Sequence, residues 1–186
     1  MLILASKSPR RKELLSLITD EFEIKSADVD ESLPEGIAPD RAVEYLSQIK
    51  AQPFDNGADT VIGADTVVAI DGKILGKPSD RSEAFEMLKM LSGRYHSVFT
   101  GVTVITPLGK STVSVETRVK FFDLSDDEIK DYVGTGECDD KAGAYGIQGK
   151  GALLVERIEG DYFNVVGLPV SRLNRMLINN VHNRQI

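Results

Sequence analysis

MLILASKSPRR, residues 1–11, joins a short apolar run directly to two serines, a proline and two arginines. Leu2–Ala5 is typical of a buried strand. Pro9 suits the first position of a helix, where its missing N–H costs nothing, and the apolar residues that follow recur at helical spacing. A strand, a tight turn and a helix N-terminus are therefore predicted to meet between Ser6 and Arg11.

This turn has the chemistry of an anion site. Backbone N–H groups at Arg10, Arg11 and Lys12 are expected to be free at the helix N-terminus. The hydroxyls of Ser6 and Ser8 and two guanidinium groups would converge on the same point, and phosphate is the obvious anion. The alternative is that Ser8 merely caps the helix and the arginines form a solvated first turn. Two successive cations oppose the helix dipole by a few tenths of a kcal/mol each, roughly, which favours the anion site.

Composition excludes several classes of protein. The 186 residues carry a net charge of −7, which argues against a nucleic-acid polymer as partner. A single cysteine, Cys138, excludes an intrachain disulfide and fits a reducing compartment. The apolar runs are too short for a signal peptide or a membrane span, so we expect a cytoplasmic protein without membrane contact. With only His96 and His182 and no zinc-binding pattern, we do not expect zinc. We expect one domain over residues 1–186.

Apolar periodicity and turn residues predict alternating strands and helices. Asp71-Gly72 and residues 107–109 indicate hairpin turns, and capping boxes at Asp80 and Ser125 indicate helix starts. The predicted elements are a strand over 2–5, a helix from 9, a strand from 22, a helix over 39–50, a strand over 60–70 with a hairpin return from 73, a helix to 92, strands over 95–106 and 110–124, a helix after 125, a strand over 152–158 and a last helix from 169.

The predicted strand Thr60–Ile70 contains a carboxylate, Asp65, in an otherwise apolar run. Burying it is costly unless it is paired, hydrogen-bonded or bound to a metal. Structural pairing is one interpretation, but Gly63 and Ala64 leave room for another group to approach, which favours a functional role. Lys50, near the end of the preceding helix, is open to two interpretations, since a lysine there also simply complements the helix dipole.

Residues 136–152, GECDDKAGAYGIQGKGA, hold five glycines and show no apolar periodicity. A loop of this length is more often functional than filler, and Asp140, Lys141, Tyr145 and Gln148 are chemically capable side chains. The alternative is a mobile surface loop. Neither a dinucleotide-binding fingerprint nor a P-loop explains the glycines.

The motifs SxSPRR, GADTVV, LGKP, LSGRYHSV, DKAGAYGIQG and VVGLP follow in this order, and by them the chain resembles the Maf family of nucleoside triphosphate pyrophosphatases from Leu2 to about Leu177. The resemblance implies hydrolysis of a nucleoside triphosphate to the monophosphate and pyrophosphate, with a divalent cation, Mg²⁺ or Mn²⁺, in a housecleaning role. It also implies an α/β fold similar to inosine triphosphatases: an elongated mixed β-sheet with flanking helices, two lobes around a cleft, and a homodimer.

The resemblance also implies roles for individual residues. Asp65 matches the general base, and Asp30 or Glu31 matches an acidic metal position beside it. The branch that takes dTTP and UTP is the most similar, with specificity positions at Arg10, Thr66 and Gln148. Cys138 and Phe163 depart from the residues common in the family. The implied triphosphate contacts, together with Ser6 of the anion turn, are Ser8, Arg10, Arg11, Lys50, Lys77 and Lys141.

Two alternatives stay open. The protein could be a nucleotide-binding regulator, for instance of cell division, or a pyrophosphatase for other nucleotides such as ITP or 7-methyl-GTP. A sensor needs the anion turn but has no use for a base-capable carboxylate, so Asp65 favours the enzyme. A triphosphate carries about four negative charges, which an acidic protein attracts only through a concentrated cationic site and a bridging metal.

Overall fold

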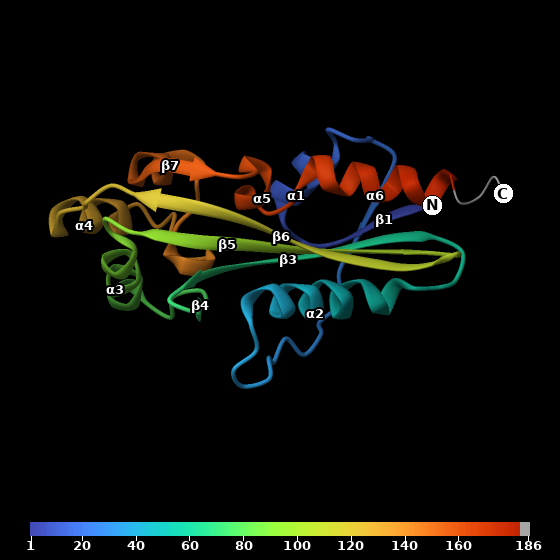
Figure 1. The fold of residues 1–186 in the computed structure, drawn as a ribbon, viewed down its shortest axis with the longest axis horizontal. Coiled ribbons are helices and arrows are strands. Elements are labelled where there is room, and N and C mark those ends of the chain that lie inside the picture. The colour runs from blue at the N-terminus through green and yellow to red at the C-terminus, as the bar shows by residue number, and fades with distance from the viewer. Residues whose placement is uncertain (183–186) are drawn as a thin grey trace. The chain divides into compact units, whose positions relative to one another are not determined.

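The structure is a computed structural model that describes residues 1–182, and Figure 1 shows the order of its elements. The strands are β1 (Leu2–Ala5), β2 (Glu23–Lys25), β3 (Thr60–Ile70), β4 (Lys73–Leu75), β5 (Tyr95–Thr106), β6 (Gly109–Phe121) and β7 (Val155–Glu159). The α-helices are α1 (Pro9–Leu15), α2 (Pro39–Ala51), α3 (Arg81–Leu91), α4 (Asp126–Gly134), α5 (Tyr162–Val166) and α6 (Val170–His182). Short 3₁₀ helices are η1 (Gln52–Phe54), η2 (Ala142–Ala144) and η3 (Gly149–Leu154).

The strands form one seven-stranded mixed sheet in the order β2-β1-β3-β5-β6-β7, with β4 paired to β3. β1 pairs in parallel with both neighbours, as in the register of Ile3 with Val61. β4 and β7 pair antiparallel with β3 and β6. The hairpin between β3 and β4 turns at Asp71 and Gly72, whose φ angles are 52° and 76°, as expected for an Asp-Gly turn of type I′. The prediction of a mixed α/β fold with flanking helices is confirmed.

The chain divides into two compact units, each built from separate segments. The first contains residues 1–65, 100–115 and the chain from 167, and the second contains residues 66–99 and 116–166. In the first unit α2 lies on one face of the sheet, and α1 and α6 lie on the other (Figure 1). The predicted cleft between two lobes stays a prediction.

Helix α2 packs unusually close to the sheet at two glycines. A Cβ atom on Gly63 of β3 would lie 2.2 Å from the carbonyl oxygen of Ser47, and one on Gly101 of β5 would lie 2.1 Å from that of Val43. Only glycine permits such an approach of two backbones. The group that approaches β3 at Gly63 is therefore the backbone of α2.

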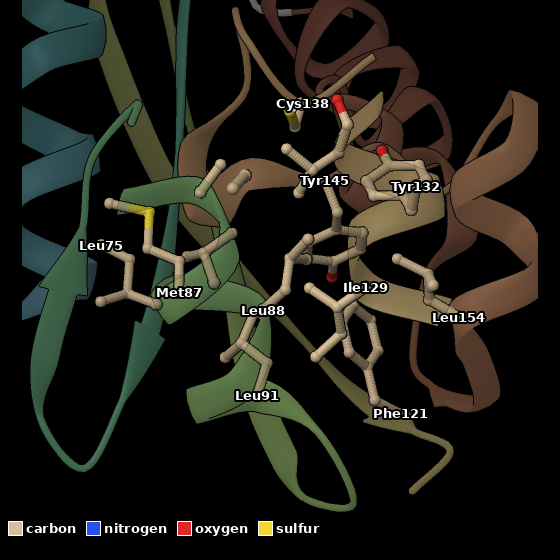
Figure 2. Close-up of a cluster of buried hydrophobic side chains, with 14 of the residues drawn as sticks. Leu75, Met87, Leu88, Leu91, Phe121, Ile129, Tyr132, Cys138, Tyr145 and Leu154 are labelled. Carbon is tan, nitrogen blue, oxygen red and sulfur yellow. Dashed lines mark hydrogen bonds between the residues drawn. The ribbon is translucent and has the colours of Figure 1, made fainter. Parts of the chain in front are cut away.

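The second unit has its own apolar core, shown in part in Figure 2. Leu88 and Leu91 of α3 and Ile129 of α4 pack with Phe121 of β6 and with Tyr145, which comes from the glycine-rich segment. In that segment the burial also extends to Cys138, Ala144 and Ile147. The alternative of a mobile surface loop is therefore wrong for its apolar residues.

Local predictions failed at four places. The strand predicted over 110–124 ends at Phe121. The strand predicted over 152–158 begins only at Val155, because the residues before it form η3. Helix α5 was not predicted, since five residues are too few to show periodicity. At α3 the N-cap Asp80 accepts from Glu83 N, but the Glu83 carboxylate accepts from Ser79 rather than from Asp80. The capping box at Ser125 and Glu128 is complete, as predicted.

Across residues 1–182, none of the helices combines the length and the apolar character that crossing a membrane requires.

Candidate active site

The turn after β1 satisfies most of its own polar groups. Ser8 is the N-cap of α1, and its Oγ accepts from the N–H of Arg11 at 3.4 Å. The N–H of Lys12 donates to the Ser8 carbonyl at 3.2 Å. The expectation of free N–H groups at Arg11 and Lys12 was therefore wrong. Of the alternative, the capping of the helix by Ser8 is confirmed, but Arg11 is half-buried rather than solvated.

Arg11 connects this turn to a distant part of the chain. Its Nε donates to the carbonyl oxygen of Gly167 at 2.9 Å, and its Nη1 donates to Ser6 Oγ at 3.4 Å. Ser6 Oγ also accepts from Ser8 N at 3.2 Å. Sequence reasoning missed the Gly167 carbonyl, although Gly167 belongs to the VVGLP motif that it singled out. Ser6 and Arg11 thus have structural partners, whatever else they bind.

Burial shapes the electrostatics of Arg11. Desolvation lowers the pKa of its guanidinium, and the neighbouring Arg10 adds to this lowering. The carboxylates of Asp65 and Glu31 act in the opposite direction. An arginine stays protonated in spite of such shifts, so Arg11 is a fixed positive charge close to two carboxylates.

Those carboxylates meet at Lys50. Its Nζ lies 2.5 Å from Asp65 Oδ1 and 3.0 Å from Glu31 Oε2. The side chains of Asp65 and Lys50 are 12% and 19% exposed, whereas that of Glu31 is 55% exposed.

The packing of α2 explains how Lys50 reaches Asp65. Gly63 and Asp65 lie on the same face of β3, because successive side chains alternate between faces. The backbone of α2 lies against Gly63, and Lys50 stands in the last turn of that helix. Lys50 therefore both complements the helix dipole and pairs with Asp65, as the structural interpretations of these two residues expected. Their functional roles stay predictions.

Asp30 is hydrogen-bonded to a different residue. Its Oδ1 accepts from both the N–H and the hydroxyl of Ser32, and these bonds lower the pKa of Asp30. Within residues 1–182, no set of three or more histidine, cysteine or acidic side chains is placed to hold a metal ion. Of the two acidic residues expected beside Asp65, it is Glu31 that shares Lys50 with it, and metal binding by this pair stays a prediction.

The remaining predicted residues belong to the second unit. The N–H of Gly143 donates to the carbonyl oxygen of Gly76 at 3.0 Å, so the LGKP and DKAGA motifs, which carry Lys77 and Lys141, lie side by side. Lys141 Nζ lies 2.8 Å from the Glu137 carbonyl oxygen and 2.6 Å from a carboxylate oxygen of Asp140.

The other second-unit candidates differ in exposure. Lys77 and Gln148 are exposed, and Thr66 is half-buried. Because the two units are separate compact bodies, the joint action of these residues with Asp65 stays a prediction.

Fold and candidate site define a class of protein: a mixed α/β protein in which a cationic turn after the first strand accompanies a partly buried aspartate–lysine pair. The chain belongs to the Maf family, whose model, described as Maf-like protein, matches residues 1–180.

Curated relatives match nearly the whole chain. A protein of Geobacillus sp. (strain WCH70) named dTTP/UTP pyrophosphatase is 53% identical, over 94% of this chain and 95% of its own. A protein of the same name from Clostridioides difficile (strain 630) is 52% identical, over 95% and 93%. The solved Ham1 protein of Staphylococcus aureus superposes with a TM-score of 0.50 at 14% identity, over 66% of this chain and 72% of that one. That likeness concerns the fold alone.

Proposed function

We propose that this chain hydrolyses dTTP and UTP to the monophosphate and pyrophosphate. The observation that carries the proposal is the group formed by Asp65, Lys50 and Glu31 beside Arg11, in a family whose curated members at 50–53% identity are named dTTP/UTP pyrophosphatases. A regulator that only senses nucleotide needs cations but has no use for a carboxylate in this position. A slightly exposed aspartate that is positioned by an ion pair with a lysine fits the activation of a water molecule.

In this proposal Asp65 is the general base. A carboxylate has about four lone-pair sites, and the bond to Lys50 uses one of them at Oδ1, so Asp65 keeps acceptor capacity for a water molecule. Arg10, Arg11 and Lys50 neutralise the phosphate oxygens, with Lys77 and Lys141 as further contacts. Ser6 and Ser8 act mainly by fixing the turn that presents the arginines.

We further propose that a divalent cation, Mg²⁺ or Mn²⁺, binds together with the substrate. Mg²⁺ is held in many nucleotide enzymes by one or two carboxylates together with substrate phosphates. Glu31 and Asp65 fit that donor set, since both carboxylates already share one cation, the ammonium of Lys50. We place Glu31 rather than Asp30 in this role. When bound, the metal would offset phosphate charge and polarise a phosphoryl oxygen.

For the base we propose recognition by Gln148, with Thr66 and Arg10 at the other specificity positions. Uracil and thymine present an imide N–H between two carbonyl oxygens. The amide of Gln148 offers both an acceptor and donors for that pattern, whereas a carboxylate offers acceptors only. The proposed substrate preference is thus dTTP and UTP over CTP and purine nucleotides.

A nucleotide panel with detection of pyrophosphate tests the proposal. We expect pyrophosphate and the monophosphate from dTTP and UTP. Water attacks the α phosphorus, and the bond from that atom to the oxygen bridging to the β phosphorus breaks, with pyrophosphate as the leaving group. In ¹⁸O water the label should enter the monophosphate. Label in pyrophosphate, or orthophosphate as the first product, would contradict the proposal.

A further inference from the structure

The glycine-rich segment adopts a backbone that needs external support. Gly143 and Ala144 have φ angles of 67° and 60°, and this left-handed region costs a residue such as alanine about 1 kcal/mol. A Cβ atom on Gly143 would lie 2.9 Å from the Val68 side chain, so the segment also lies tightly against β3. Such a conformation persists only where the surrounding contacts fix it. The next residue, Tyr145, is where the fixing contacts lie.

Tyr145 anchors the segment in the core of the second unit, and its side chain is labelled in Figure 2 together with Phe121. The residue is 5% exposed. Its ring meets Phe121 edge-on at 4.7 Å between centroids and His96 at 5.4 Å. Its hydroxyl lies 2.7 Å from Nε2 of His96 on β5. His96 belongs to the LSGRYHSV motif, which the proposed function leaves without a role.

Burying the polar groups of His96 and Tyr145 in the core costs free energy. His96 is 3% exposed, and its Nδ1 has no hydrogen-bond partner among the residues that the structure describes. Burial lowers the pKa of His96 to about 4, so the ring is neutral near pH 7. Two apolar side chains would be buried at lower cost. The polar pair fixes the orientation of the Tyr145 side chain, because its hydrogen bond forms in only one placement of that side chain.

The position of Tyr145 affects that of Lys141, because the Lys141 side chain packs against the next residue, Gly146. A Cβ atom on Gly146 would lie 2.7 Å from Lys141 Cε, so the lysine stem crosses the backbone immediately after Tyr145. The N–H of Gly146 donates to the Tyr132 hydroxyl at 3.3 Å, which fixes the same point from the other side. Gln148 follows two residues later.

We propose that His96 and Tyr145 are a buried positioning pair that holds residues 141–148 in the conformation that binds nucleotide. The inference rests on the proposed function, in which Lys141 and Gln148 contact the substrate. Neither His96 nor Tyr145 touches nucleotide. Their bond raises the fraction of molecules whose segment is competent to bind.

Tyr145→Phe tests the pair, because it removes only the hydroxyl. If the competent fraction falls, the apparent affinity falls with it while the bound enzyme turns over normally. We expect KM for UTP to rise about 5-fold or more, the scale of one buried hydrogen bond, with kcat within about 2-fold of wild type. The preference for UTP over CTP should also weaken. The matched control is Tyr95→Phe, which removes the exposed hydroxyl bond to Glu159 at 2.8 Å one residue from His96 and should change neither quantity.

Changes at His96 separate positioning from packing. His96→Leu should reproduce the KM of Tyr145→Phe, and the double variant should be no worse than either single one, because both remove the same bond. His96→Gln places an amide near Nε2 and should restore most of the affinity. If the two single effects multiply, or if glutamine is as harmful as leucine, the pair only packs and the proposal is overturned.

Hydrogen exchange gives a readout that does not depend on turnover. Amides of residues 141–148 should exchange about 5-fold or more faster in Tyr145→Phe than in the Tyr95→Phe control. A wild-type protein that releases no pyrophosphate from any nucleotide would overturn the proposed function, while the exchange result would still decide whether the pair holds the segment. Unchanged exchange, or an unchanged KM in an active enzyme, would overturn the positioning pair.

Discussion

Replacing Asp65 by asparagine separates charge from shape at the centre of the candidate site. Asparagine fills nearly the same volume but carries no charge, so Lys50 loses the anionic partner at 2.5 Å and keeps Glu31 at 3.0 Å. Removing one partner of a fully buried ion pair costs about 3–5 kcal/mol. Because Lys50 is 19% exposed and retains Glu31, we expect the free energy of unfolding to fall by about 2 kcal/mol.

The effect on turnover should be larger than the effect on folding. Loss of a general base lowers kcat by about 10²-fold or more. The loss of stability corresponds to a melting temperature lower by about 4–8 °C for a chain of this size. Near 25 °C the variant should therefore be folded and almost inactive, so the two effects can be measured apart.

The assay combines pyrophosphate release from UTP with circular dichroism and thermal melting. Asp59→Asn is the matched control, since Asp59 is also ion-paired, to the N-terminal ammonium at 2.8 Å, and lies just before β3. It should keep near-normal turnover. A folded Asp65→Asn enzyme with kcat close to wild type would refute the assignment of Asp65 as the base.

Three further predictions concern specificity, packing and pH. Gln148→Glu should lower kcat/KM for UTP about 10-fold or more and raise the relative use of CTP, as measured with both nucleotides, because the carboxylate loses the amide donors. Gly63→Ala should destabilise the protein by about 1–3 kcal/mol and reduce turnover, because the new methyl group would collide with α2 at Ser47. The control Gly134→Ala, which has open space around it, should change neither quantity. Urea unfolding and kinetics measure both. The third concerns His96, whose pKa falls from 6.5 unfolded to about 4 folded. The unfolded chain therefore binds more protons between these values, and wild type should lose about 3 kcal/mol more stability than His96→Gln as pH falls through this window, as measured by urea midpoints.

Local signals carried the prediction of the fold. The strand Thr60–Ile70 was predicted with its observed bounds, because β-branched residues end there at an Asp-Gly pair that only a tight turn explains. Ser125 and Glu128 predicted the start of α4, because both residues of the capping box lie within one helical turn. In each case the residues that decide the structure are adjacent in sequence.

The sequence indicated which residue types to expect in the candidate site, but not which groups those residues contact. Gly63 correctly signalled a close approach to β3, but nothing local states whether a ligand or a helix approaches. Arg11 was singled out as a phosphate contact, which stays a prediction, and the sequence gives no sign that its Nε donates to a carbonyl 156 residues away. Tyr145 lies in a segment without apolar periodicity, so nothing local predicts its burial. Its partners Phe121 and His96 come from two strands that are distant in sequence. These contacts are tertiary, so sequence pattern is silent about them.

Charge among the five candidate side chains of the first unit is close to balance, which constrains how a triphosphate can bind. Arg10, Arg11 and Lys50 supply three positive charges, and Asp65 and Glu31 supply two negative ones. The single positive charge left over falls well short of the about four negative charges of a triphosphate. Lys77 and Lys141 would add two, but Lys141 already lies 2.6 Å from the carboxylate of Asp140. If these are the side chains that bind the triphosphate, as proposed, they would leave it with excess negative charge.

This shortfall predicts a strict dependence on a divalent cation. Chelation should lower kcat/KM for UTP by about 10²-fold or more, since metal stabilisation of phosphoryl charge amounts to several kcal/mol, and Mg²⁺ or Mn²⁺ should restore it. Glu31→Gln should raise the metal concentration needed for half-maximal rate, whereas Asp30→Asn, whose carboxylate is bonded to Ser32, should leave it unchanged. Full activity after chelation would show that cations outside this group neutralise the triphosphate, and the placement of Glu31 and Asp65 around a metal would then be wrong.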